Sequence, residues 1–227
     1  MVNGADVALM SSLAFLAMGD EQRGLDLSYQ GTEQALSASG LECAMFGHYC
    51  TGLNNLHTRN LDEAQRAFAS SLKLLADHPE IRSQDQLINE VHAGSAIAQF
   101  FGGRSEALSD MERTLKNAEA IGDEYTVAFI GQALGEAYTS MGDFGRAKRY
   151  LDIASEYYRR NDMVPYLARV LKSVGYWHEE QGQDAEAEQA RAEYLRLLEG
   201  LPKPPVRPLS CFLTAPDESA PTLYADR

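Results

Sequence analysis

The sequence predicts an all-α protein, a right-handed superhelical solenoid of about five helical hairpins, on the evidence of two recurring small residues. One recurs near the start of the second helix expected in each hairpin, at Gly24, Ala64, Ala107, Ala147 and Ala187. The other stands twelve positions earlier each time, at Ser12, Gly52, Ser95, Gly135 and Gly175. The intervals in both series are 40, 43, 40 and 40 residues, which indicates five copies of one structural unit.

Close helix packing explains why small residues recur in this register. A Gly, Ala or Ser where two helices cross lets the backbones approach, and larger neighbours interlock over it. A single hairpin cannot bury its apolar stripe alone, so successive hairpins stack and share a core. We therefore expect one solenoid over residues 1–200, without strands.

Turn signals separate the two helices of each expected hairpin, at residues 19–20, 59–60, 102–103, 141–143 and 182–184. Most of these turns contain glycine, which ends helices readily because it adopts left-handed backbone conformations. The proline of His78-Pro79-Glu80 breaks a helix, and an insertion there accounts for the single 43-residue interval.

Further stop and start signals lie between the hairpins. Gly122 followed by Asp123 predicts one helix end and an acidic cap for the next helix. Asn161-Asp162 before Pro165 predicts another boundary, because proline is accepted in the first turn of a helix. Gly200 ends the last helix of the solenoid.

The segment 201–227 is rich in proline and lacks helical periodicity, which predicts a flexible tail. Pro202, Pro205 and Pro208 would suit a polyproline helix for an adaptor domain. A linker or an unstructured terminus accounts for the same composition and is the favoured interpretation.

The net charge of the 227-residue chain is −13, with a pI near 4.8. An acidic surface repels phosphate backbones and anionic lipids, so we expect neither nucleic acid nor membrane as a partner. Three cysteines, Cys43, Cys50 and Cys211, form no disulfide framework, and no stretch is long and apolar enough for a membrane span. These features favour a cytoplasmic protein.

No constellation for catalysis or metal binding stands out in the sequence. Cys43, His48 and Cys50 lack the spacing and the fourth ligand of a zinc site, so two small core cysteines are the simpler interpretation. Gly102-Gly103-Arg104-Ser105 lacks the lysine of a phosphate-binding loop. We therefore expect no enzyme, no cofactor and no metal.

The unit Leu134-Gly135…Tyr138…Gly142-Asp143…Ala147…Leu151…Ala154 and its copies resemble tetratricopeptide repeats. The resemblance covers about residues 6–199. The family's period is roughly 34 residues, whereas here it is 40, and the proline that often closes the family's unit is missing from most copies. The longer form is similar to repeats in large bacterial regulators, such as signal-transduction ATPases and transcription activators, where they act as sensor or scaffold segments.

The resemblance implies that the first helix of each repeat lines the concave side of the solenoid. Carried over by register, the expected partner-binding groove comprises Phe46, Tyr49, Leu53, His92, Phe100, Phe129, Gln132, Arg169, Lys172 and Tyr176. The family's Lys/Asn clamp for a terminal carboxylate is not reproduced, although Arg169 and Lys172 are suited to an acidic group. The alternative is that several of these aromatic residues only fill space between helices.

These observations favour a protein-interaction or scaffold module that binds a peptide or protein in the concave groove, within a bacterial regulator. The alternative is a domain that senses a small molecule or peptide, which a deep enclosed pocket would favour. The first helix is apolar nearly all round, and terminal repeats need a polar outer face. We expect an upstream domain or a second copy of the chain to dock on it, at Val7, Leu9, Met10, Leu13, Phe15, Leu16 and Met18.

Overall fold

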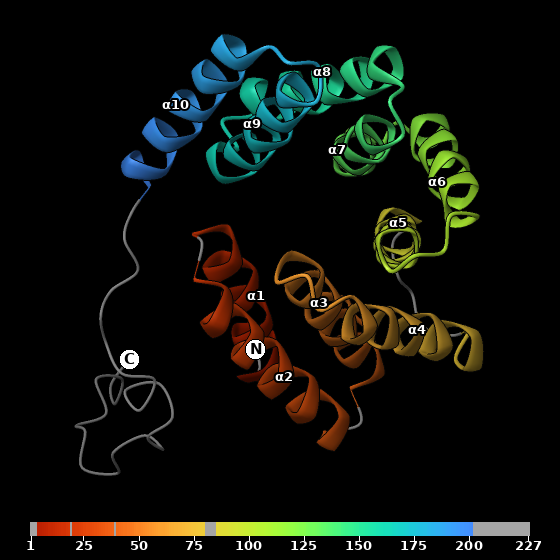
Figure 1. Cartoon of the computed structure of the whole chain (residues 1–227). Helices are drawn as coiled ribbons and strands as arrows, with labels where there is room; N and C mark the ends of the chain where they lie inside the picture. The colour runs from red at the N-terminus through yellow and green to blue at the C-terminus, as the bar shows by residue number, and fades with distance from the viewer. Residues whose placement is uncertain (1–3, 19, 39, 80–84, 202–227) are drawn as a thin grey trace, which may run out of the picture.

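The computed structural model describes residues 4–18, 20–38, 40–79 and 85–201, and Figure 1 shows their arrangement. This part of the chain contains ten helices and no strand. They are α1 (Gly4–Ala17), α2 (Glu21–Ser37), α3 (Leu41–His57), α4 (Leu61–Asp77), α5 (Asp85–Phe101), α6 (Ala107–Ile121), α7 (Glu124–Ser140), α8 (Phe144–Arg160), α9 (Val164–Glu179) and α10 (Asp184–Gly200).

The helices pack in consecutive antiparallel pairs, and the pairs stack into an open curve (Figure 1). Each odd-numbered helix also contacts the next odd-numbered helix, from α1 through α3, α5 and α7 to α9. In Figure 1, α3, α5, α7 and α9 lie on the inside of the curve, and α4, α6, α8 and α10 lie on the outside. The all-α, hairpin-stacked architecture is thus confirmed, with the first helix of each hairpin on the concave side.

The predicted small residues lie at the helix crossings. A Cβ atom on Gly135 of α7 would come within 2.6 Å of the Leu151 side chain and 3.4 Å of the Ala147 carbonyl oxygen on α8. A Cβ on Gly24 of α2 would lie 3.0 Å from the Ser12 carbonyl oxygen on α1. The partners predicted twelve positions apart therefore face one another, because only small residues allow this approach.

The predicted helix ends are also in place. Asp123 and Asp143 cap α7 and α8, accepting hydrogen bonds from the backbone N–H groups of Thr126 and Arg146 at 3.1 and 3.0 Å. Helix α4 ends at Asp77, two residues before Pro79. Pro165 lies in the first turn of α9. Glu80 of the predicted insertion and the predicted tail beyond residue 201 lie outside the described residues.

One predicted turn departs from the glycine pattern. Gly142 and Gly182 have φ values of 76° and 68°, in the left-handed region. Arg59 stands at the equivalent position of the second hairpin, five residues before Ala64, and has φ 60°. The left-handed conformation costs a non-glycine residue roughly 1–2 kcal/mol of conformational free energy. The turn at Arg59 is therefore strained.

The turn geometry makes a testable contrast between two glycines three residues apart. Gly142→Ala should lower the free energy of unfolding by about 1–2 kcal/mol, because alanine resists the left-handed conformation; a Cβ there would meet nothing within 4 Å. Gly145→Ala, inside α8, should raise it by up to about 1 kcal/mol through helix propensity. Urea unfolding followed by circular dichroism measures both, and shifts of the same sign would contradict the turn assigned to Gly142.

Helix α1 presents a mixed surface. Leu9 and Leu16 are buried in the main core, whereas Val7 and Met10 are 55% and 61% exposed. An apolar strip on an exposed terminal helix agrees with the sequence-based expectation of a docked partner. That expectation stays a prediction.

Candidate binding face

Several of the predicted groove residues fill the space between helices. Tyr49 and Leu53 are only 3% and 5% exposed. Phe46, Phe100 and Phe129 are partly buried and pack against the main core. These side chains therefore pack between helices more than they face a partner. The sequence had left this alternative open for the aromatic residues.

A cluster of tyrosines and one carboxyl group involves four inner helices, α3, α5, α7 and α9. The Tyr49 hydroxyl on α3 donates a hydrogen bond to the Glu90 carboxylate on α5. The Tyr125 ring on α7 lies 6.4 Å from Phe129 and 6.1 Å from Tyr166 of α9, measured between ring centres. Sequence reasoning missed Glu90, Tyr125 and Tyr166. The available signal was spacing, since Tyr49 and Glu90, like Tyr125 and Tyr166, stand 41 residues apart, close to the repeat interval.

Burial controls the protonation of this cluster. Desolvation, with smaller contributions from Tyr125 and Glu90, raises the pKa of the Tyr49 hydroxyl well above its ordinary value. Desolvation also raises the pKa of the Glu90 carboxyl group, although the hydrogen bond from Tyr49 partly opposes it. The folded protein therefore favours the protonated form of Glu90 more than the unfolded chain does.

This shift predicts a pH-dependent stability difference between the wild type and Glu90→Gln. A raised folded pKa contributes stability that is complete below the unfolded pKa and is lost as pH rises through the folded pKa. Glutamine cannot ionise, so the variant should gain stability relative to the wild type as pH rises from about 4.5 to 7.5. Urea unfolding across that range measures the difference. In a Tyr49→Phe background the gain should grow, because the opposing hydrogen bond is gone; a gain independent of pH would contradict the assignment.

His92 lies away from the other predicted groove residues. Its side chain is exposed. Desolvation is the main cause that lowers the pKa of His92. Arg113 of the outer helix α6 lowers it further, and Asp110 of the same helix raises it. The structure therefore does not bring His92 together with Tyr49 and Phe129.

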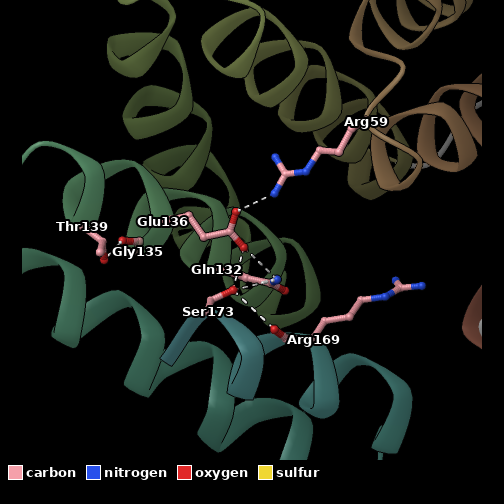
Figure 2. A network of polar contacts seen from close by, with 7 residues as sticks. All are labelled: Arg59, Gln132, Gly135, Glu136, Thr139, Arg169 and Ser173. Atoms are coloured by element: carbon pink, nitrogen blue, oxygen red, sulfur yellow. Dashed lines mark hydrogen bonds and ion pairs between the residues drawn. The ribbon is translucent and has the colours of Figure 1, made fainter. Parts of the chain in front are cut away.

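A polar network joins α7, α9 and the α3–α4 turn, as Figure 2 shows. One oxygen of the Glu136 carboxylate accepts hydrogen bonds from Ser173 at 2.6 Å and from Gln132 at 3.2 Å. The other oxygen pairs with the Arg59 guanidinium at 3.4 Å. The predicted groove residue Gln132 thus helps to fix a carboxylate on the concave side.

Arg59 reaches this network from its strained turn. Its side chain is 63% exposed, and its guanidinium lies 5.3 Å from the centre of the Phe101 ring. A long ion pair at an exposed cation contributes little to stability. The Arg59 guanidinium is therefore held near Glu136 but remains accessible to solvent.

The Arg169 side chain of α9 points away from Glu136, as Figure 2 shows. Its guanidinium donates a hydrogen bond to the Leu16 carbonyl oxygen at 2.8 Å, a contact between residues 153 positions apart. Burial lowers its pKa, but an arginine remains cationic at neutral pH. The pKa of His57 is well below its ordinary value. Burial is the main cause, and the positive charges of Arg169 and Arg59 add to it.

Lys172 and Tyr176 are the exposed members of the predicted groove on α9. Tyr176 is 38% exposed. Burial and Glu180 raise the pKa of the Tyr176 hydroxyl. Tyr176 stands three residues after Ser173 on α9, so the two side chains lie on neighbouring positions of one helix face. An exposed aromatic ring, a lysine and an ordered polar network therefore adjoin one another on the concave side of α7 and α9.

The described part of the chain groups no three His, Cys, Asp or Glu side chains that could hold a metal ion. Cys43 donates a hydrogen bond to Asp6 at 3.2 Å, and burial together with Asp6 raises the pKa of its thiol to about 11. Such a thiol is a poor nucleophile at neutral pH. Among the same residues, none of the helices is long and apolar enough to cross a membrane.

Comparison with known proteins adds no family to this geometry. Neither the scan against protein-family models nor the search of curated proteins finds a match to the chain. The relation to tetratricopeptide repeats therefore stays a prediction that rests on the repeated residues.

Proposed function

We propose that the chain is a protein-interaction module that binds a peptide or an extended protein segment on the concave side of α7 and α9. The observation that carries the proposal is the exposed pair Lys172 and Tyr176 on α9, the helix whose Ser173 donates a hydrogen bond to Glu136 of α7. Fixed polar groups lose little entropy on binding, and an accessible tyrosine offers contact area at small entropic cost. The predicted binding surface thereby moves from Tyr49 and His92 to the end of the groove formed by α7 and α9.

The resemblance to the long repeats of bacterial regulators supports a scaffold or sensor role within such a protein. Free thiols at Cys43 and Cys50 support a cytoplasmic location. The net charge of −13 supports a protein partner over nucleic acid.

Peptide selection tests the proposal. A phage-displayed library of random peptides is panned against the wild type, and the enriched peptides are titrated by calorimetry. We expect the double variant Lys172→Ala/Tyr176→Ala to bind them about tenfold more weakly or worse, because it removes an aromatic anchor and a cation.

The matched control lies on the outer helix α8. Lys148→Ala/Asp152→Ala removes an exposed ion pair of 2.6 Å and should leave the affinity unchanged. Equal losses in both double variants, or enriched peptides that bind the α9 variant as well as the wild type, would place binding elsewhere.

A further inference from the structure

Arg169 is a partly buried cation with few partners among the described residues. A guanidinium carries five N–H donors. Its one hydrogen bond to a described residue goes to the Leu16 carbonyl oxygen, and no carboxylate of the described residues lies within ion-pair distance. The Tyr166 ring adds a cation–π contact, with its centre 5.6 Å from the guanidinium carbon. Burying a charge without an ionic partner is costly, so this position suits an incoming anion.

The neighbouring charges strengthen that preference. The positive charges of Arg169 and Arg59 both act on His57 at the end of α3 and, together with burial, favour its neutral form. Two carboxylates balance them in part: Glu136 pairs with Arg59, and Glu21 of α2 acts on Arg169 at longer range. Glu136 already accepts three hydrogen bonds, from Ser173, Gln132 and Arg59. It has little capacity left to neutralise Arg169.

The present partner of Arg169 is the carboxyl end of α1. The carbonyl groups of Ala14 and Phe15 accept hydrogen bonds from the backbone N–H groups of Met18 and Asp20, at 3.0 and 2.9 Å. The Leu16 carbonyl accepts from the Arg169 guanidinium instead. The C-terminal end of a helix carries a partial negative charge of about half an electron. The Leu16 carbonyl oxygen therefore takes the place that an anion would occupy beside Arg169, with only a partial negative charge.

We propose that Arg169 forms a carboxylate site for an acidic side chain of the bound peptide, and that the peptide displaces the Leu16 carbonyl from Arg169. This inference rests on the proposed function and names the chemistry of its ligand. A carboxylate binds a guanidinium through two charge-assisted hydrogen bonds, which are stronger than the single bond to a carbonyl. Binding therefore releases α1 from α9 and loosens the contact between the two ends of the superhelix.

Calorimetry with hexaglutamate, amidated at its C-terminus, tests the site. Arg169→Gln should weaken binding about tenfold or more, and Arg169→Lys should weaken it by less because the charge remains. Arg159→Gln, which removes an exposed arginine of α8 paired with Glu193, is the matched control and should bind as the wild type does. A neutral Gly-Ser-Gly-Ser-Gly-Ser peptide with a free C-terminus separates the two sources of carboxylate, and we expect no binding of it.

Amide hydrogen exchange tests the displacement. Hexaglutamate should speed exchange in residues 4–17 of the wild type several-fold, because α1 loses a tertiary contact. Arg169→Gln should show the faster exchange without any peptide, while circular dichroism confirms that it is folded.

The contradicting results are distinct. Hexaglutamate that binds Arg169→Gln and the wild type equally, or binding of the Gly-Ser peptide alone, would overturn the site. Binding that leaves α1 exchange unchanged would overturn the displacement. If selected peptides require Lys172 and Tyr176 but hexaglutamate does not bind, the carboxylate site fails while the interaction module stands. If hexaglutamate requires Arg169 but selected peptides ignore Lys172 and Tyr176, the proposed binding surface fails instead.

Discussion

Phe68→Ala should lower the free energy of unfolding by about 3–5 kcal/mol, because truncating a fully buried phenylalanine leaves a cavity. Phe68 of α4 is 0% exposed. A Cβ on Gly52 of α3 would come within 2.6 Å of its ring, and the same ring blocks a Cβ on Gly94 of α5. The Phe68 ring thus packs between the second and third hairpins, at a close approach that only glycine permits. The cavity left by alanine can close only if α3, α4 and α5 shift toward one another.

Chemical denaturation followed by circular dichroism measures this loss. A domain of ordinary stability has 5–15 kcal/mol available, so the variant should unfold at a much lower urea concentration. Lys116→Ala on the exposed face of α6 serves as the control and should change stability by less than about 0.5 kcal/mol. A loss below about 1 kcal/mol for Phe68→Ala would mean that the second and third hairpins are not packed around this ring.

Gly135→Leu should cost about 1–3 kcal/mol, and more if the hairpin cannot adjust, because it overpacks a helix crossing. The clashing neighbour is the side chain of Leu151, which is itself buried, with only 1% of its surface exposed. Ala147→Leu, at the facing position on α8, should cost a similar amount, since Ala147 is 0% exposed.

Gly175 provides the matched position in the next hairpin. A Cβ there would make ordinary contacts, 3.7 Å from the Ala187 carbonyl oxygen and 3.9 Å from Ala190. Gly175→Ala should therefore be neutral or stabilise by up to about 1 kcal/mol through helix propensity. Thermal melting of Gly135→Leu and Gly175→Ala compares the two sites, and a larger loss at Gly175 would contradict the packing described for these crossings.

The fold was predictable because its information is local and repeated. The pairs at Ser12/Gly24, Gly135/Ala147 and Gly175/Ala187 report a helix crossing within a few residues of a turn. A left-handed glycine such as Gly142 and a capping aspartate such as Asp143 fix where each helix ends. Five agreeing copies outweigh the weak signal of any one.

The binding face was predictable only in part. Helical register placed Gln132, Arg169 and Tyr176 on the concave side, but it carries no information on how closely neighbouring inner helices approach. That distance decides that Tyr49 is buried against Glu90 and that Tyr176 is exposed. The contact between Arg169 and Leu16 depends on the accumulated curvature of the whole superhelix, a sum of small rotations per repeat that no single segment encodes. Arg59 was assigned to a turn, and its role in the network needed the position of Glu136.

Amide hydrogen exchange in the presence of a selected peptide tests whether the concave side of α7 and α9 binds the partner. The bound peptide should slow amide exchange in the C-terminal halves of α7 and α9, around Glu136 and Tyr176, while the outer helices α8 and α10 keep the exchange rates of the free protein. Protection confined to α8 and α10, or to the exposed strip of α1, would contradict this expectation.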